Sequence, residues 1–311
     1  MSTLSSNKPK ILITGANGLL GQKLVEQLVV AGNFTVIATG RGACRLSGVG
    51  FTYQSLDIEN EQEVEATLSQ LKPDVLIHGA AMTHVDECEK NQEGCYRANV
   101  LATTYLVRAA EKVGSHFIFV STDFIFSGED GHNPYTEEAV PDPVNYYGQT
   151  KLEGEELLKR SSLKWAIART VLVYGLANDL SRSNIILWVK SSLEAGKQIQ
   201  VVDDQERTPT LAEDLAAGCI LIAKQRATGV YNISGEEVLT PYQMAIETAD
   251  YFGLNKELIV RTDSTKFTQP ARRPMRTGFI IQKAKNQLGY RPKTFRMGIG
   301  ILAKQIILAH S

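Results

Sequence analysis

KILITGANGLLG, residues 10–21, joins a short apolar run to a turn that contains three glycines. From Leu20 onward, apolar residues recur at helical spacing, so the glycines lie between a predicted strand and a predicted helix. Glycines in this context let the backbone turn sharply and approach a pyrophosphate, which the N–H groups of the helix N-terminus then bind. We therefore predict a dinucleotide-binding loop, formed by Gly15, Asn17, Gly18, Leu19, Leu20 and Gly21. The alternative is a plain glycine turn.

The rest of the chain alternates apolar runs with segments of helical periodicity. We expect strands near 34–38, 51–56, 74–77, 116–120, 165–168, 199–202 and 230–233, and helices near 60–71, 87–113, 183–195, 211–224, 241–253 and 295–309. Strands of this kind are typical of a parallel sheet covered on both faces. The predicted fold is α/β, a Rossmann-type doubly wound parallel sheet with a smaller C-terminal α/β substrate-binding domain. We assign residues 8–175, with about 211–233 returning, to the NADP-binding domain, and about 176–210 and 234–311 to the substrate-binding domain.

The predicted strand 34–38 ends in Thr39-Gly40-Arg41-Gly42. In a Rossmann fold this position lies beside the adenosine ribose, where a carboxylate favours NAD and an arginine accommodates the 2′-phosphate of NADP. Arg41 occupies the position and no acidic residue is near it. We expect NADP(H) as the preferred cofactor, with NAD(H) as an alternative. Farther along, the small residues Ala80 and Ala81 follow a strand and leave room for a ligand across the sheet edge.

The segment from Ser121 to Lys151 carries the candidate catalytic residues. Ser121 and Thr122 end an apolar strand, while Tyr147 and Lys151 are four residues apart on one face of a predicted helix. A hydroxyl, a phenol and an ammonium together form a site that can donate a proton to a carbonyl. A nearby ammonium favours the phenolate, so we expect Lys151 to lower the pKa of Tyr147. The alternative is that Tyr147 packs in the core and Lys151 is solvated.

Composition excludes several other classes of function. The chain has 311 residues, 43% of them hydrophobic, and a formal net charge of −1, which gives no electrostatic reason to expect nucleic acid or an anionic membrane as partner. Cys44, Cys88, Cys95 and Cys219 show no ligand spacing, and the histidines are scattered, so we expect reduced thiols and no metal. The polar N-terminus is not a secretory signal. These features favour a cytoplasmic enzyme.

Several of these segments together resemble the extended short-chain dehydrogenase/reductases, and most closely the dTDP-4-dehydrorhamnose reductase group. The matching segments are Thr14–Gly21, Asp57-Ile58, Ala80-Ala81 with Thr83 to Asp86, Ser121-Thr122-Asp123, Tyr147 with Lys151, Asp204 to Thr210, and Arg273-Pro274. The resemblance implies that Asp57 and Ile58 contact the adenine, that Lys151 holds the nicotinamide ribose, and that Arg273 contacts a nucleotide diphosphate. The substrate-binding residues it implies are Thr83, Val85, Ser121, Asp123, Arg207 and Arg273, and a homodimer is possible.

The resemblance implies NADPH-dependent reduction of a 4-keto group on a nucleotide-activated sugar, with Tyr147 as proton donor and Thr122 orienting the carbonyl. Leu172 departs from the pattern, because the rhamnose enzymes usually have a tryptophan there. Two alternatives stay open. One is a nucleotide-sugar epimerase of the same superfamily, and the other is a non-catalytic NADP-binding regulatory subunit. Dehydratases usually carry Asp-Glu after the hydroxyl, whereas Phe124 follows Asp123 here.

Overall fold

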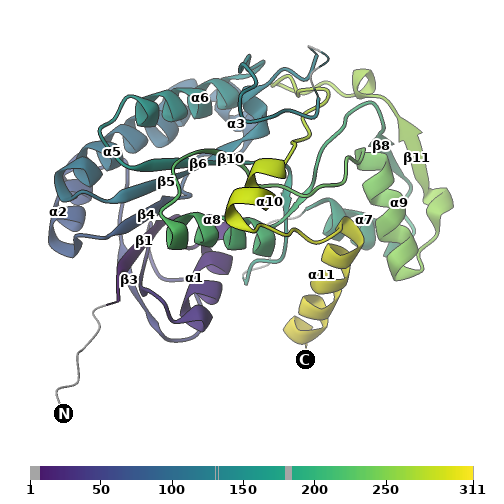
Figure 1. Ribbon diagram of the computed structural model, residues 1–311. Helices are drawn as coiled ribbons and strands as arrows, with labels where there is room; N and C mark the ends of the chain where they lie inside the picture. The colour runs from purple at the N-terminus through teal and green to yellow at the C-terminus, as the bar shows by residue number, and fades with distance from the viewer. Residues whose placement is uncertain (1–7, 130, 132, 179–183, 311) are drawn as a thin grey trace.

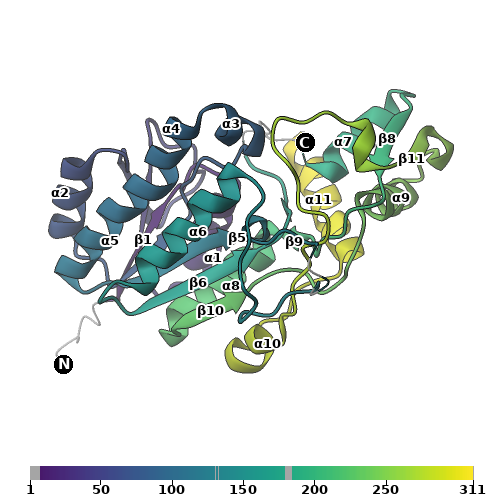
Figure 2. The same ribbon diagram turned by 90° about the horizontal axis from the view of Figure 1, so that it is seen from above.

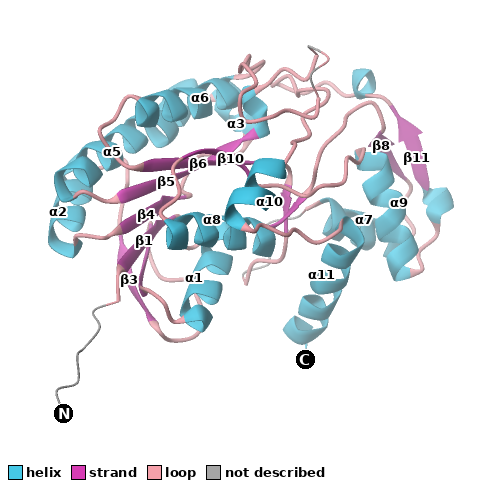
Figure 3. Cartoon of the chain, in the orientation of Figure 1, coloured by secondary structure: helices cyan, strands magenta, loops and turns pink. Residues whose placement is uncertain are grey.

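The computed structural model describes residues 8–129, 131, 133–178 and 184–310. Its centre is a seven-stranded sheet in the order β10-β6-β5-β4-β1-β2-β3, in which every pair of neighbours is parallel (Figure 3). The strands are β1 Lys10–Thr14, β2 Thr35–Gly40, β3 Phe51–Ser55, β4 Val75–His78, β5 His116–Thr122, β6 Trp165–Thr170 and β10 Gly229–Asn232. The central strands are buried along almost their whole length, as expected for a sheet covered on both faces.

Helices cover both faces of the sheet (Figure 1). Helices α1 Leu19–Ala31, α8 Ala212–Gln225 and α10 Gln282–Leu288 pack with one set of strand side chains, which includes Ile11, Ile13 and Ile118. Helices α2 Glu61–Leu71, α5 Ala102–Val113 and α6 Tyr146–Lys159 enclose the alternate set, which includes Leu12, Phe117 and Phe119. Alternation of side chains along each strand thus divides the core into two layers.

The C-terminal part lies beside the end of this sheet (Figure 2). It consists of α7 Ile185–Glu194, β8 Ile199–Val202, α9 Pro241–Phe252, β11 Ile259–Thr262 and α11 Phe295–His310, with β8 and β11 paired in parallel. A second small pair joins β7 Val173–Tyr174 to β9 Thr210–Leu211. Short 3-10 helices cover Asp123–Ile125, Lys256–Leu258 and Ser264–Lys266. Thr240 caps α9 with a complete capping box and Pro241 in the first turn, as its sequence predicts.

The predicted fold class is confirmed, and the region 87–113 is helical as predicted, with a break that the prediction did not include. That region divides into α3 Val85–Lys90, α4 Gln92–Tyr96, a π-helical turn Arg97–Leu101 and α5. Asn91 causes the first break, because its side chain accepts a hydrogen bond from the Gly94 N–H and caps a new helix. Helix α8 and strand β10 return to the sheet after residue 211, although the boundaries of two separate domains stay a prediction. All four cysteines are free thiols. No helix within the described ranges is long and apolar enough to cross a membrane.

Candidate active site at the edge of the parallel sheet

A cavity of about 880 Å³ lies along the carboxyl ends of the strands, within the volume range of small-molecule and cofactor sites. Loops after β1, β2, β4, β5 and β6 line it, together with the first turns of α6. Most of the predicted site residues are among its lining residues: Gly15, Asn17, Gly18, Leu19, Leu20, Gly21, Arg41, Ile58, Ala80, Ala81, Thr83, Val85, Ser121, Thr122, Asp123, Tyr147 and Lys151. Parallel strands end at one edge, which explains why residues so distant in sequence meet there.

The glycine loop is shaped to hold an anion. Gly15 has a φ of 73°, and the Gly18 N–H donates to the Gly15 carbonyl at 2.9 Å, which closes a tight turn. A Cβ on Gly21 would lie 2.4 Å from the Gly15 carbonyl oxygen, whereas a Cβ on Gly18 would meet only that oxygen, at 3.3 Å. No side chain in the described chain caps the first turn of α1. The N–H groups there are therefore available to a pyrophosphate.

Asn17 organises the neighbouring loop after β2. Its amide nitrogen donates to the carbonyls of Arg41 and Ala43 at 3.4 and 3.0 Å, and its amide oxygen accepts from the Arg45 N–H at 2.9 Å. The Tyr53 hydroxyl supports the same loop through the carbonyls of residues 40 and 42, both at 3.0 Å. Asn17, which is predicted to bind the cofactor, thus also fixes the loop that carries Arg41.

One prediction at this end of the cavity needs correction. Arg41 was expected to have no acidic residue near it, but its guanidinium lies 3.7 Å from the carboxylate of Glu59, in the loop after β3. Asp57 is next to the cavity lining, and its carboxylate accepts a hydrogen bond from the Glu59 N–H at 3.0 Å. Ile58 and Glu59 line the cavity there, and the adenine contact of Asp57 stays a prediction.

The wall next to the glycine loop depends on a buried histidine. His78, at the end of β4, is hydrogen-bonded through Nδ1 to the Thr14 hydroxyl at 2.7 Å and through Nε2 to the Thr103 hydroxyl at 3.1 Å. Burial lowers the pKa of His78 to about 3, so its ring is neutral. The ring thereby joins β1 to α5 directly beneath Ala80, whose N–H donates to the same Thr14 hydroxyl. His78 is a structural residue, not a ligand.

Tyr147, Thr122 and Lys151 line the same cavity. Tyr147 is buried, with 8% of its surface exposed. The Thr122 hydroxyl donates to Asp123 Oδ1 at 3.1 Å and accepts from the Phe124 N–H at 3.2 Å. Thr122 thus holds the Asp123 carboxylate at the end of β5, in the wall that also contains the phenol.

The expected lowering of the Tyr147 pKa was wrong for the protein in this state. Burial raises the pKa of the phenol above its ordinary value, the Thr122 side chain opposes this only in part, and the Asp123 charge raises it further. Tyr147 therefore keeps its proton at neutral pH. Lys151 responds to burial in the opposite sense, and its pKa is lowered to about 7, with the Glu155 charge acting against the shift.

The Lys151 ammonium faces the cavity without a hydrogen-bond acceptor from the described residues. Its Nζ lies 4.0 Å from the centre of the Phe119 ring, and its side chain is 4% exposed. A buried cation without acceptors is costly, and sugar hydroxyls entering the cavity would satisfy it. Together with the open glycine loop, this unpartnered ammonium fits a nicotinamide dinucleotide cofactor.

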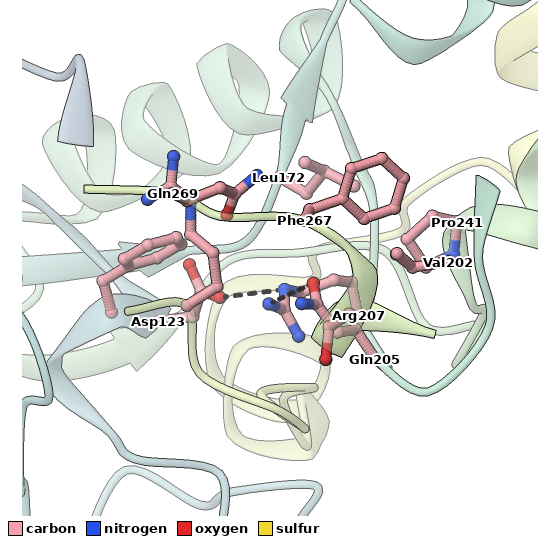
Figure 4. A pocket seen from close by; sticks show the side chains of 11 residues that line it. Asp123, Leu172, Val202, Gln205, Arg207, Pro241, Phe267 and Gln269 are labelled. Atoms are coloured by element: carbon pink, nitrogen blue, oxygen red, sulfur yellow. Dashed lines mark hydrogen bonds and ion pairs between the residues drawn. The ribbon is translucent and has the colours of Figure 1, made fainter. Parts of the chain in front are cut away.

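A smaller cavity of about 210 Å³ adjoins the first (Figure 4). Asp123, Phe124 and Leu172 line both cavities, so the two cavities meet at these residues. Leu172 has a φ of 37°, a left-handed conformation that is costly for a branched residue and often marks a functional site. The remaining lining residues come from the C-terminal part: Val202, Gln205, Arg207, Pro241, Ser264, Phe267, Gln269 and Arg273. Apolar surfaces, two amides and two arginines suit a flat polar ring that carries a phosphate.

Three predicted substrate-binding residues in this region are engaged within the protein. Arg207 is 5% exposed and donates to the carbonyls of Pro274 and Met275 at 2.6 and 3.0 Å, while its Nε lies 3.8 Å from the Asp123 carboxylate. Arg273 forms an ion pair with Asp86. Burial raises the pKa of Asp123, and the Arg207 charge partly opposes it. Ser121 Oγ is buried and, among the described residues, has no hydrogen-bond partner.

Sequence reasoning missed several residues of both cavities: Arg45, Glu59, Arg97, Phe124, Gln205, Phe267 and Gln269. Gln205 lies within the segment Asp204 to Thr210 that the sequence singles out, and Gln269 lies close before Arg273-Pro274. Arg45 and Glu59 come from two loops and Arg97 from a π-helical turn, and they share no motif, so no local pattern could have grouped them.

Comparisons with known proteins agree with this geometry. The family described as "RmlD substrate binding domain" matches residues 9–307. Methionine adenosyltransferase 2 subunit beta of Xenopus tropicalis is 32% identical over 297 residues, covering 93% of this chain and 86% of that protein.

Two solved structures extend the likeness to three dimensions. A dTDP-4-dehydrorhamnose reductase from Clostridium acetobutylicum has a TM-score of 0.83 and 28% identity, covering 96% of this chain and 99% of that one. A dTDP-4-dehydrorhamnose reductase from Bacillus anthracis, solved in complex with NADP, has a TM-score of 0.81 and 25% identity, with coverage of 96% and 99%.

Proposed function

This chain belongs to the RmlD substrate binding domain family, within the extended short-chain dehydrogenase/reductases, and we propose that it reduces the 4-keto group of a nucleotide-activated sugar with NADPH. The observation that carries the proposal is the junction of the two cavities. Tyr147, Thr122 and Lys151 line the large cavity, and Asp123, Phe124 and Leu172 connect it to the small one. A sugar at the junction would extend its nucleotide into the small cavity.

The large cavity would hold the cofactor, which supplies a hydride when it is bound. In this proposal the first turn of α1 and the glycine loop bind the pyrophosphate, and Lys151 donates hydrogen bonds to the nicotinamide ribose. The relative from Bacillus anthracis, solved with NADP, supports this choice of cofactor. The wall formed by Ala80 and Ala81 leaves space for the nicotinamide half.

Tyr147 would act as the general acid. Its raised pKa keeps the phenolic proton in place at neutral pH, which is the form required to protonate a carbonyl oxygen. Thr122 would orient that oxygen, exchanging its acceptor Asp123 for the substrate. Burial of the pair excludes bulk water, so the proton passes to the substrate and not to solvent.

The small cavity would bind the nucleotide. Phe267 offers an aromatic surface, Gln205 and Gln269 offer amide donors and acceptors, and Arg273 is positioned at the wall to meet the diphosphate. Arg207 would act indirectly, because its hydrogen bonds to the carbonyls of Pro274 and Met275 hold the segment that follows Arg273. This refines the prediction that Arg207 contacts the substrate.

Purified protein incubated with NADPH and a 4-keto nucleotide sugar tests the proposal. Net consumption of NADPH, with a reduced sugar as product, is expected. Product without net consumption would instead identify an epimerase. Cofactor binding without turnover over a panel of nucleotide sugars would favour a regulatory subunit, the function suggested by the relative named methionine adenosyltransferase 2 subunit beta. Thermal shifts with the same panel would identify the nucleotide, because a ligand that binds only the folded state raises its stability.

A further inference from the structure

Charged residues gather at the end of the large cavity that lies beyond β2. Three arginines and one acidic residue line it there, namely Arg41, Arg45, Arg97 and Glu59. Glu59 lies between two of the arginines: its carboxylate is 3.7 Å from the Arg41 guanidinium and 3.3 Å from that of Arg97. Arg97 also pairs with Glu93, at 3.1 Å, outside the cavity lining. Glu59 is thus shared by Arg41 and Arg97 at the cavity wall.

These ion pairs are exchangeable. The side chains of Arg41 and Arg97 are 73% and 53% exposed, and that of Glu59 is 24% exposed, so each pair is screened by water and contributes little to stability. A phosphate dianion accepts stronger, bidentate hydrogen bonds from a guanidinium than a solvated carboxylate does. Both arginines can therefore turn from Glu59 to a phosphate at small cost.

The loop that carries Arg41 and Arg45 is already fixed without a ligand. The Asn17 side chain donates two hydrogen bonds to the backbone of this loop and accepts one from it, and the Tyr53 hydroxyl lies within hydrogen-bonding distance of two further carbonyls. Arg97 projects from the π-helical turn on the other side of Glu59. Preorganised loops lose little entropy on binding, which favours a dedicated anion site over a chance surface cluster.

We propose that Glu59 sets the cofactor preference of this site through its competition for Arg41 and Arg97. While both arginines neutralise it, the site accepts the 2′-phosphate of NADP(H). When either arginine is removed, the Glu59 carboxylate is released to repel that phosphate and to accept a hydrogen bond from the 2′-hydroxyl of NAD(H). This inference rests on the proposed dinucleotide site. It assigns a role in cofactor choice to Glu59 and Arg97, in addition to Arg41 at the end of β2.

Calorimetry on the full-length protein tests the inference. It would measure the dissociation constants of NADPH and NADH at low and at physiological ionic strength. Arg41→Ala and Arg97→Ala should each weaken NADPH binding about tenfold, the equivalent of one charge-assisted hydrogen bond. Binding of NADH should stay the same or tighten. Glu59→Gln should tighten NADPH binding roughly threefold, because it removes a carboxylate close to the phosphate. Arg108→Ala is the matched control, because Arg108 pairs with Glu61 outside the cavity.

The outcomes separate this inference from the proposed function. Equal losses of NADPH and NADH affinity in the arginine variants would overturn it, as would a Glu59→Gln variant with unchanged NADPH binding. An Arg108→Ala variant that behaves like Arg97→Ala would also overturn it, since the effect would then be one of general surface charge. If the unaltered protein binds neither cofactor, the proposed function itself fails.

Discussion

The guanidinium of Arg273 forms a bidentate ion pair with the carboxylate of Asp86, with Nη1–Oδ1 and Nη2–Oδ2 distances of 2.8 and 2.9 Å. The Ala271 N–H donates to the same carboxylate at 3.2 Å. The hydrogen bonds from Arg273 lower the pKa of Asp86, which keeps the carboxylate charged. The pair connects the loop that carries Arg273, at the wall of the small cavity, to helix α3, which carries Asp86.

Replacing Arg273 with lysine should therefore impair substrate binding selectively. A lysine is a point charge that cannot keep a bidentate contact with Asp86 while it meets a diphosphate. In Arg273→Lys we expect KM for the nucleotide sugar to rise about tenfold, with NADPH affinity unchanged. Arg272→Lys is the control, because Arg272 pairs with Glu129 at the surface. Steady-state kinetics would contradict this role of Arg273 if both variants had the same KM.

Removing the Tyr147 hydroxyl should abolish most turnover and leave the site assembled. We expect Tyr147→Phe to lower kcat by roughly 10²–10⁴, the usual contribution of a general acid. NADPH binding should be nearly intact, because the ring still packs with Phe124. Turnover measured at saturating cofactor checks this. A variant as active as the unaltered protein would remove Tyr147 from the mechanism.

The buried Lys151 should make the stability of the cofactor-free protein depend on pH. Its pKa is about 7 in the folded state against an ordinary value of 10.5, so between these values the unfolded state binds more protons. Stability should therefore rise as pH increases from about 7 to 10.5, and the cost of burying the charge is fully present below 7. Lys151→Met should raise the free energy of unfolding on the order of a few kcal/mol at pH 6, and Tm should rise with it. Both gains should shrink by pH 10.

Lys159→Met provides the matched control for that experiment, since Lys159 lies on the same helix but is partly exposed and pairs with Glu156. Its Tm difference should be small and independent of pH. A Tm gain for Lys151→Met that stays constant from pH 6 to 10 would mean that charge burial is not its cause.

The two glycines of the cofactor loop should respond differently to alanine. Gly18 has an ordinary φ of −85°, and an added Cβ would approach only the Gly15 carbonyl oxygen, at 3.3 Å. The Gly18→Ala variant should fold with a nearly normal Tm. Its methyl group would occupy space next to the helix N-terminus, so NADPH binding should weaken about tenfold or more. Gly21→Ala should destabilise the fold itself, because its Cβ would lie 2.5 Å from the Ala16 Cα. Melting curves with and without NADPH separate the two effects.

The sequence predicts the sheet, and which residues meet at its edge, for a definite reason. Apolar runs such as 116–120 are buried on both faces, and residues that end parallel strands must meet at one edge, so Thr122 and Ala80 could be placed together in advance. Properties that depend on burial could not be predicted this way. The rise in the Tyr147 pKa comes from desolvation, and the engagement of Arg207 comes from carbonyls 67 and 68 residues away. The pairing of Glu59 with Arg41 and Arg97 likewise joins two loops and a π-helical turn that no periodicity relates.

Strand β10 pairs only with β6 and completes the sheet after a long excursion through the C-terminal part. During synthesis, the first six strands therefore emerge from the ribosome before α8 and β10. Strand β10 then covers the edge of the sheet, and α8 covers part of one of its faces. Until residue 232 has been translated, β6 presents an unpaired edge and the face beside α1 is bare, both of which invite aggregation. A fragment that stops near residue 175 would keep that unpaired edge and uncovered face, so we expect it to aggregate unless residues 212–232 are supplied.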